Sequence, residues 1–287
     1  TRRSGGMHYT SIENIHKVID PLFLDELKAE FEEIRNIAVK RTRERKLQDF
    51  QKKLSTLTFL DPACGSGNFL TETYLSLRRL ENEILQELQG GQMVLGYDNM
   101  NPIQVSISQF YGIEINDFAV TVAKTALWIA ESQMMKETES IVLMHLDFLP
   151  LKTNAFIHEG NALQVDWESV IPKYQLSYIM GNPPFVARAG RTKAKDSSSK
   201  GMLDDTQKTD RLNVFGEDLG NVDYVACWFK KAAVFTKNTA IRCAFVATDS
   251  ICQGQQIYPI WKNILQDDIY INFAYKFFKW NSEAGKT

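Results

Sequence analysis

The sequence lacks the features that mark several large classes of protein. No apolar run approaches the roughly 18 residues of a membrane span, and the polar residues 1–6 are not followed by the apolar core of a signal peptide. The four cysteines have no C-x-x-C spacing, so neither a disulfide framework nor a zinc site is expected. We therefore expect a protein of a reducing compartment, the cytoplasm, without bound metal and without membrane contact.

The sequence also lacks a strong excess of charge of either sign. Its 33 Lys and Arg against 35 Asp and Glu give a formal net charge of −2. A nucleic-acid enzyme with this balance needs a local basic face or a separate basic domain. The 287 residues, 44% of them hydrophobic, suffice for one large domain or two small ones. Because the chain starts at Thr and not at Met, we expect a piece of a longer protein.

Strand-like apolar runs alternate with helix-like stretches over most of the chain. Strands are expected at 57–61, 110–115, 155–163 (with a turn), 176–180, 241–248 and 269–278. Helices are expected after a capping box of Thr10 and Glu13, and then at 20–53, 68–88, 117–136, 222–235 and 255–265. This alternation predicts an α/β fold with a mostly parallel twisted sheet and helices on both faces, preceded by an N-terminal helical segment.

Two stretches break this pattern. Residues 90–108 are rich in turn-forming residues and are expected to form an inserted loop or hairpin. Residues 188–211 contain few large apolar side chains, and their first half is basic. This second stretch is expected to be a mobile loop, either without a role or acting as a lid that phosphates order; we prefer the lid.

A Gly-x-Gly turn follows the first expected strand. A strand, the turn Gly65-Ser66-Gly67 and a helix form the first unit of a nucleotide-binding fold, in which glycines let the backbone pass close to a ligand. Leu70 replaces the third glycine of the dinucleotide pattern, which argues against NAD or FAD. Glu114, near the end of the second strand, can accept hydrogen bonds from ribose hydroxyls; alternatively it is a solvent-facing loop carboxylate.

The stretch Tyr178 to Phe185, Y-I-M-G-N-P-P-F, ends a buried strand with a stiff loop. Two prolines fix two φ angles and remove two N–H donors, and Asn182 before them is biased to an extended conformation. Its side-chain oxygen and the Pro183 carbonyl can accept hydrogen bonds from the amine of an adenine, while Phe185 stacks on the flipped base. The alternative is an ordinary turn with this ring in the core. Alone, the motif leaves DNA, RNA and protein amide substrates open.

Four motifs stand out along the chain: D-P-A-C-G-S-G-N-F-L at 61–70, Y-G-I-E-I at 111–115, G-N-A-L at 160–163 and G-N-P-P-F at 181–185. Their order and spacing resemble those of the N6-adenine DNA methyltransferases that use S-adenosylmethionine (SAM). The chain most resembles the methyltransferase region of fused type II restriction–modification enzymes with the gamma-type motif order. Stretches at 248–256 and 278–284 add to the likeness.

This resemblance implies a Rossmann-like SAM-dependent methyltransferase fold, and a function in which the N6 amine of a flipped adenine in double-stranded DNA is methylated as part of a restriction–modification system. It makes a fused upstream nuclease plausible. The implied cofactor-binding residues are Tyr9, Thr10, Asp61, Ala63, Gly65, Gly67, Phe69, Glu114, Ile115, Asn161 and Ala162. The implied catalytic residues are Asn182, Pro183, Pro184 and Phe185.

The resemblance also sets expectations about extent. Residues 1–55 are expected to form an N-terminal helical segment, and 56–287 a catalytic domain truncated before its seventh strand and before a target-recognition domain, so that the piece alone could be inactive. Two rival functions stay open. One is methylation of protein glutamine amides, although those enzymes usually carry Tyr at Phe185 and lack the early Tyr-Thr segment. The other is a non-catalytic module that binds DNA or a partner.

Overall fold

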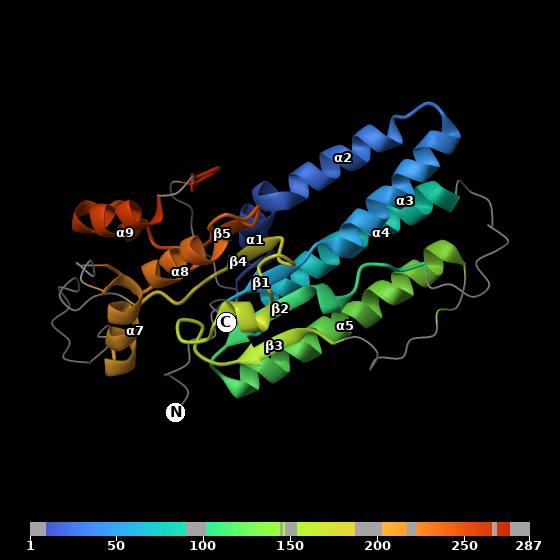
Figure 1. Ribbon diagram of the computed structural model, residues 1–287. Helices are drawn as coiled ribbons and strands as arrows, with labels where there is room; N and C mark the ends of the chain where they lie inside the picture. The colour runs from blue at the N-terminus through green and yellow to red at the C-terminus, as the bar shows by residue number, and fades with distance from the viewer. Residues whose placement is uncertain are drawn as a thin grey trace.

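A five-stranded, wholly parallel sheet lies at the centre of the computed structural model, which describes residues 10–89, 102–143, 146, 154–186, 203–216, 222–265 and 269–275. The strands are β1 (Phe59–Asp61), β2 (Phe110–Glu114), β3 (Phe156–Glu159), β4 (Tyr178–Gly181) and β5 (Arg242–Phe245). Their order is β3-β2-β1-β4-β5 (Figure 1). The order reverses direction between β1 and β4, and in such sheets ligands bind at the carboxyl ends of the strands flanking that point.

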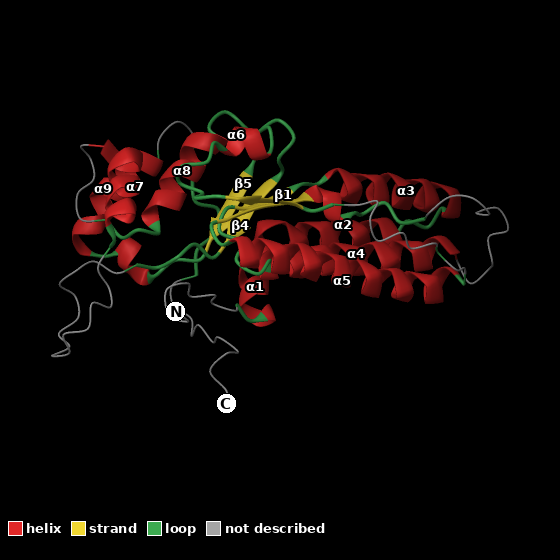
Figure 2. Cartoon of the chain, turned by 90° about the horizontal axis from the view of Figure 1, so that it is seen from below, coloured by secondary structure: helices red, strands yellow, loops and turns green. Residues whose placement is uncertain are grey.

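Helices cover both faces of the sheet, which confirms the predicted α/β fold (Figures 1 and 2). They are α1 (Ile12–Ile19), α2 (Asp25–Arg35), α3 (Lys40–Thr56), α4 (Asn68–Gln89), α5 (Asp117–Val142), α6 (Trp167–Val170), α7 (Asp205–Phe215), α8 (Ala226–Thr236) and α9 (Ile257–Ile264), with a π-helical turn at Asp20–Leu24. None of the helices in these described ranges is both long and apolar enough to cross a membrane.

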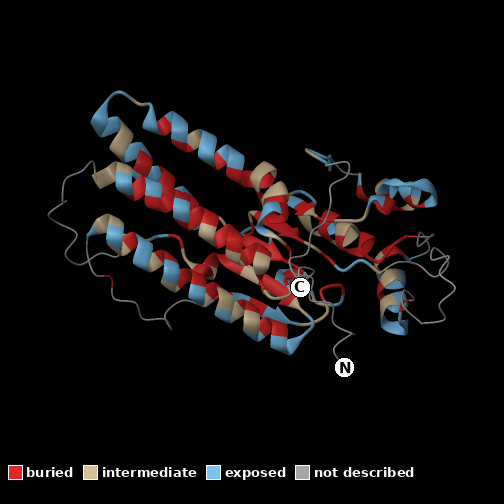
Figure 3. Cartoon of the chain, turned by 180° about the vertical axis from the view of Figure 1, so that it is seen from behind, coloured by how far each residue is buried: buried red, intermediate tan, exposed pale blue. Residues whose placement is uncertain are grey.

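Alternation along the strands builds two separate cores. Phe59 of β1 points into a core shared with α1 to α5, and the next residue, Leu60, points into a second core shared with α6 to α9. α4 has 22 residues, or about 33 Å, so it extends well beyond the short strands. Figure 3 shows the buried residues along the sides where the long helices meet.

The N-terminal helices pack directly on the sheet. The Phe23 ring lies 5.1 Å from that of Phe59 and 5.0 Å from that of Tyr178, and Arg242 at the start of β5 donates to both carboxylate oxygens of Glu26. The continuous helix predicted from 20 to 53 is interrupted at 36–39. The predicted capping box is wrong: the helix begins at Ile12, and no side chain caps it.

The predicted loop at 188–211 is wrong in its last part. Residues 187–202 lie outside the described residues, but Asp205 onwards is α7, which Asp204 and Gln207 start with a reciprocal capping box. The helix was missed because it buries few side chains and has no regular apolar stripe. The spacing of Asp204 and Gln207 is the sequence feature that could have predicted the start of this helix.

Two further expectations fail or cannot be followed. Residues 269–275 of the predicted sixth strand are not in a strand, and 276–278 lie outside the described residues. Residues 90–101 of the predicted insertion also lie outside them, and Ile107–Gln109 form a 3₁₀ turn capped by Ser106 instead of part of a hairpin. The helix at α9 does form, because Pro259 lies in its first turn, where no N–H donor is needed.

Candidate functional site

The ends of β1 and β4 touch at the carboxyl edge of the sheet. The Ala63 backbone N–H donates to Asp61 Oδ1 at 3.0 Å, so this carboxyl group closes the turn after β1. A Cβ on Gly181 would lie 2.4 Å from the same oxygen. Only glycine therefore lets β4 run past the buried carboxyl group, which brings the Asp-Pro-Ala-Cys and Asn-Pro-Pro motifs into contact.

Glu114, at the end of β2, holds the Gly-x-Gly turn in place. Its Oε2 accepts from the Gly65 backbone N–H at 2.9 Å and its Oε1 from the Asn116 N–H at 2.9 Å. The turn has Gly65 at φ +53° and Gly67 at φ +83°, a conformation that favours glycine. Glu114 thus anchors the Gly-x-Gly turn through one oxygen and the start of the next loop through the other, and each oxygen keeps a second lone pair.

Asp61 is buried without a positive partner among the described residues that surround it. It is 1% exposed. Burial raises the pKa of its carboxyl group to about 8, the negative charge of Glu114 adds to this, and the Ala63 N–H opposes it. The carboxyl group is therefore mostly neutral at pH 7, and a cation bound beside it would ionise it.

We expect this carboxyl group to make stability depend on pH. Its pKa in the folded chain, about 8, lies above its ordinary value of 3.8, so the folded state holds the proton more tightly and the free energy of unfolding falls as pH rises from about 4 to 8. The slope from one such group is about 1.4 kcal/mol per pH unit. Urea unfolding of the wild type and Asp61→Asn at pH 5, 6 and 7 should show the fall only in the wild type. Parallel curves would contradict the assignment.

The Asn-Pro-Pro loop, residues 181–185, carries a buried acceptor that is unpaired within the described part of the chain. Asn182 Nδ2 donates to Thr10 Oγ1 at 3.3 Å, whereas its Oδ1 is buried with no hydrogen-bond partner there. Such an atom costs free energy unless a ligand satisfies it. Phe185 is 39% exposed, so its ring does not fold into the core, while Pro183 is buried and Pro184 exposed.

The turn after β3 is held from two other elements. Asn161 Nδ2 donates to Asp210 Oδ2 of α7 at 2.8 Å. The carbonyl of the buried Ala162 accepts from Trp167 Nε1 and from Lys231 Nζ of α8, each at 2.8 Å. Sequence reasoning missed Asp210 and Lys231, because it placed the first in a loop and had no means of pairing the second with a turn about 70 residues earlier.

The remaining predicted residues divide between surface and core. Ile115, directly after β2, is 68% exposed, and Phe118, three residues later, is 65% exposed, so apolar side chains are exposed close in sequence to Glu114. Phe69 is 3% exposed and packs in the core with the long helices. Tyr9 lies outside the described residues. Within those residues no group of His, Cys, Asp and Glu could hold a metal ion.

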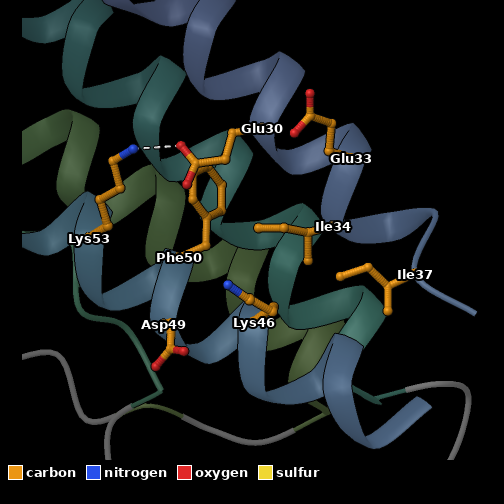
Figure 4. Close-up of a pocket in the computed structure, with 8 residues that line it drawn as sticks. All are labelled: Glu30, Glu33, Ile34, Ile37, Lys46, Asp49, Phe50 and Lys53. Atoms are coloured by element: carbon orange, nitrogen blue, oxygen red, sulfur yellow. Dashed lines mark hydrogen bonds and ion pairs between the residues drawn. The ribbon is translucent and has the colours of Figure 1, made fainter. Parts of the chain in front are cut away.

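A cleft of about 530 Å³ lies elsewhere, between α2 and α3 (Figure 4). Lys53 and Glu30 form an ion pair of 2.5 Å across it. Its lining residues are Glu30, Glu33, Ile34, Ile37, Lys46, Asp49, Phe50 and Lys53. None of them belongs to the motifs at the carboxyl edge of the sheet, so this cleft is not part of the candidate site.

The strand order, the glycine turn after β1, the acid after β2 and the Asn-Pro-Pro loop after β4 together define a Rossmann-like methyltransferase domain. The chain belongs to the family described as "MmeI, DNA-methyltransferase domain", whose model matches residues 37–287. The resemblance drawn from the motifs, to the methyltransferase region of a restriction–modification enzyme, is confirmed.

Three relatives illustrate the likeness. The chain is 40% identical over 284 residues to DNA methyltransferase A of Bacillus subtilis (strain 168), a match that covers 97% of this chain and 30% of that protein. The structure of the Type IIL restriction–modification enzyme MmeI in complex with DNA matches with a TM-score of 0.87 and 44% identity, over 99% of this chain and 36% of that one. This chain is also 32% identical over 74 residues to the adenine-specific methyltransferase PglX of Streptomyces coelicolor (strain ATCC BAA-471 / A3(2) / M145). That match covers 26% of this chain and 5% of PglX. The chain thus spans about a third of the length of the first two.

Proposed function

We propose that this chain is the DNA methyltransferase part of a restriction–modification enzyme, and that it transfers a methyl group from SAM to the N6 amine of an adenine in double-stranded DNA. The observation that carries the proposal is the buried Oδ1 of Asn182, which has no hydrogen-bond partner in the described part of the chain and lies in the loop directly after β4. The family match and the DNA-bound structure of MmeI support it.

The residues at the carboxyl edge fit SAM. The free lone pairs of Glu114 suit ribose hydroxyls, and the exposed Ile115 side chain suits the face of a purine. The buried Asp61 carboxyl group suits an ammonium group, which would supply the positive charge that its surroundings lack. When bound, SAM supplies a methyl group already activated by its positively charged sulfur.

The Asn-Pro-Pro loop orients the adenine. Since the Asn182 amide donates to Thr10, its oxygen is the atom left to accept from the target amine, and the Pro183 carbonyl accepts the second N–H. Two acceptors favour a pyramidal nitrogen whose lone pair is directed at the methyl group. Phe185 stacks on the flipped base. Chain residues therefore act by orientation and exclusion of water, which are large terms in transfer reactions.

A labelling experiment tests this function. The chain, and separately the full-length protein, is incubated with tritiated SAM and DNA, and the DNA is then digested to nucleosides. We expect the label in N6-methyladenine. Label in N4-methylcytosine would overturn the adenine specificity. Labelled methylamine released by acid hydrolysis of added protein would favour a glutamine methyltransferase. SAM binding without any transfer by the full-length protein would point to the non-catalytic alternative.

A further inference from the structure

Asp210 of α7 joins three parts of the second core through one carboxylate. It is 1% exposed. Its Oδ2 accepts from Asn161 Nδ2 at 2.8 Å and from the Tyr224 hydroxyl at 2.9 Å, and its Oδ1 accepts from Gln164 Nε2 at 2.9 Å. All three partners donate to this carboxylate. A buried carboxylate with this many donors fixes the orientation of each of them.

The orientation of Asn161 is fixed most firmly, because a second hydrogen bond holds the other end of its amide. The Leu163 backbone N–H donates to Asn161 Oδ1 at 2.9 Å. Asn161 Oδ1 faces the Leu163 N–H, and Asn161 Nδ2 faces the Asp210 carboxylate. If the amide were rotated by 180°, its NH₂ group would face the Leu163 N–H and its oxygen would face the carboxylate, and both contacts would be repulsive. The oxygen is occupied within its own turn by the Leu163 N–H, and the second N–H of Nδ2 has no acceptor among the described residues.

We propose that Asp210 is a positioning residue that holds Asn161 as a hydrogen-bond donor toward the purine ring of the cofactor. This inference rests on the proposed function. A donor at this place complements an unprotonated ring nitrogen such as N1 of adenine. In a 6-oxopurine that nitrogen carries a hydrogen, so donor would meet donor, a mismatch that polar sites reject strongly. Through Asn161, Asp210 therefore sets the preference of the proposed cofactor site for a 6-aminopurine over a 6-oxopurine.

The probes for this inference are S-adenosylhomocysteine and S-inosylhomocysteine, which differ at the 6-position and at the hydrogen on N1. Calorimetric titration of the wild-type chain should show at least a tenfold preference for the adenosyl compound. In Asp210→Ala the amide can rotate, so we expect the preference to fall to within about threefold, with weaker adenosyl binding. In Asp210→Asn the new amide can keep its oxygen toward Asn161 and turn its NH₂ group toward Gln164, provided that Gln164 rotates its own amide to present its oxygen. This variant should therefore keep most of the preference for the adenosyl compound.

Controls separate positioning from general damage. Lys208→Ala changes an exposed residue of the same helix, paired with Asp205 at 2.8 Å, and should leave the preference as it is. If Asp210→Ala does not fold, Asn161→Ala decides, because it removes the donor and leaves Asp210 with its two other partners. A tenfold preference that survives in a folded Asp210→Ala or in Asn161→Ala overturns the inference. Failure of the wild type to bind S-adenosylhomocysteine would instead count against the proposed function itself.

Discussion

Replacing Asn182 with alanine is expected to lower methyl transfer at least about a thousandfold while SAM affinity stays within about threefold. The substitution removes the buried Oδ1 that is unpaired in the described part of the chain, so the acceptor that orients the target amine is lost. Preorganised polar groups of this kind typically contribute a hundredfold to a thousandfold each, and loss of orientation adds to that. Asp61 and Glu114, at the ends of β1 and β2, keep their positions in this variant, and only the contact with Thr10 is lost on the cofactor side.

The measurement pairs single-turnover transfer to DNA with a calorimetric SAM titration for each variant. Thr10→Val is the informative companion, because it leaves the Asn182 side chain intact but removes the hydroxyl that fixes its amide. We expect an intermediate loss of rate. Tyr174→Phe, at a residue that is 80% exposed and outside the motifs of the site, is the control and should cost little. Equal losses of transfer and of SAM affinity in Asn182→Ala would refute the role assigned to this residue.

The sheet could be predicted from the sequence because its strands are short, buried and flanked by motifs. Residues at 57–61, 110–115 and 176–180 are apolar runs that end in glycine turns or acids, and β1, β2 and β4 form there. The stretch at 269–278 has similar local alternation, but a strand also needs a partner strand, and local pattern does not supply that. α7 was missed for the opposite reason: it forms although the sequence has no apolar pattern there, and only its capping pair, Asp204 and Gln207, indicates a helix.

In the candidate site, too, the features set by local sequence could be predicted, whereas the contacts between distant residues could not. The Gly-x-Gly turn and the Asn-Pro-Pro loop are local, so their residues could be named from the chain alone. The hydrogen bond from Asn182 to Thr10 joins residues 172 positions apart, and that from Asn161 to Asp210 joins residues 49 apart. No spacing rule predicts such pairs, because they depend on which elements the sheet topology brings together. What the sequence left open was therefore the orientation of the amides, not their presence.

Glu114→Ala is expected to weaken SAM binding about a hundredfold, a larger effect than any other single change at the cofactor side. Two losses combine: the acceptor for ribose hydroxyls, and the anchor for the Gly65 and Asn116 N–H groups. Glu114→Gln should be almost as damaging, because only one end of an amide can accept and the other would face a backbone N–H. Hydrogen bonds to a charged group are worth more than neutral ones, and both replacements are neutral.

A double-mutant cycle separates the two losses. S-adenosylhomocysteine and its 2′-deoxy analogue are titrated against the wild type and Glu114→Ala. If Glu114 accepts from the ribose, the wild type should prefer the hydroxylated ligand about tenfold, and the variant should bind both with similar affinity. If Glu114 only supports the glycine turn, both ligands should weaken equally and the preference should persist. The second result would leave the turn as its sole role and move the ribose acceptor to another residue of the carboxyl edge.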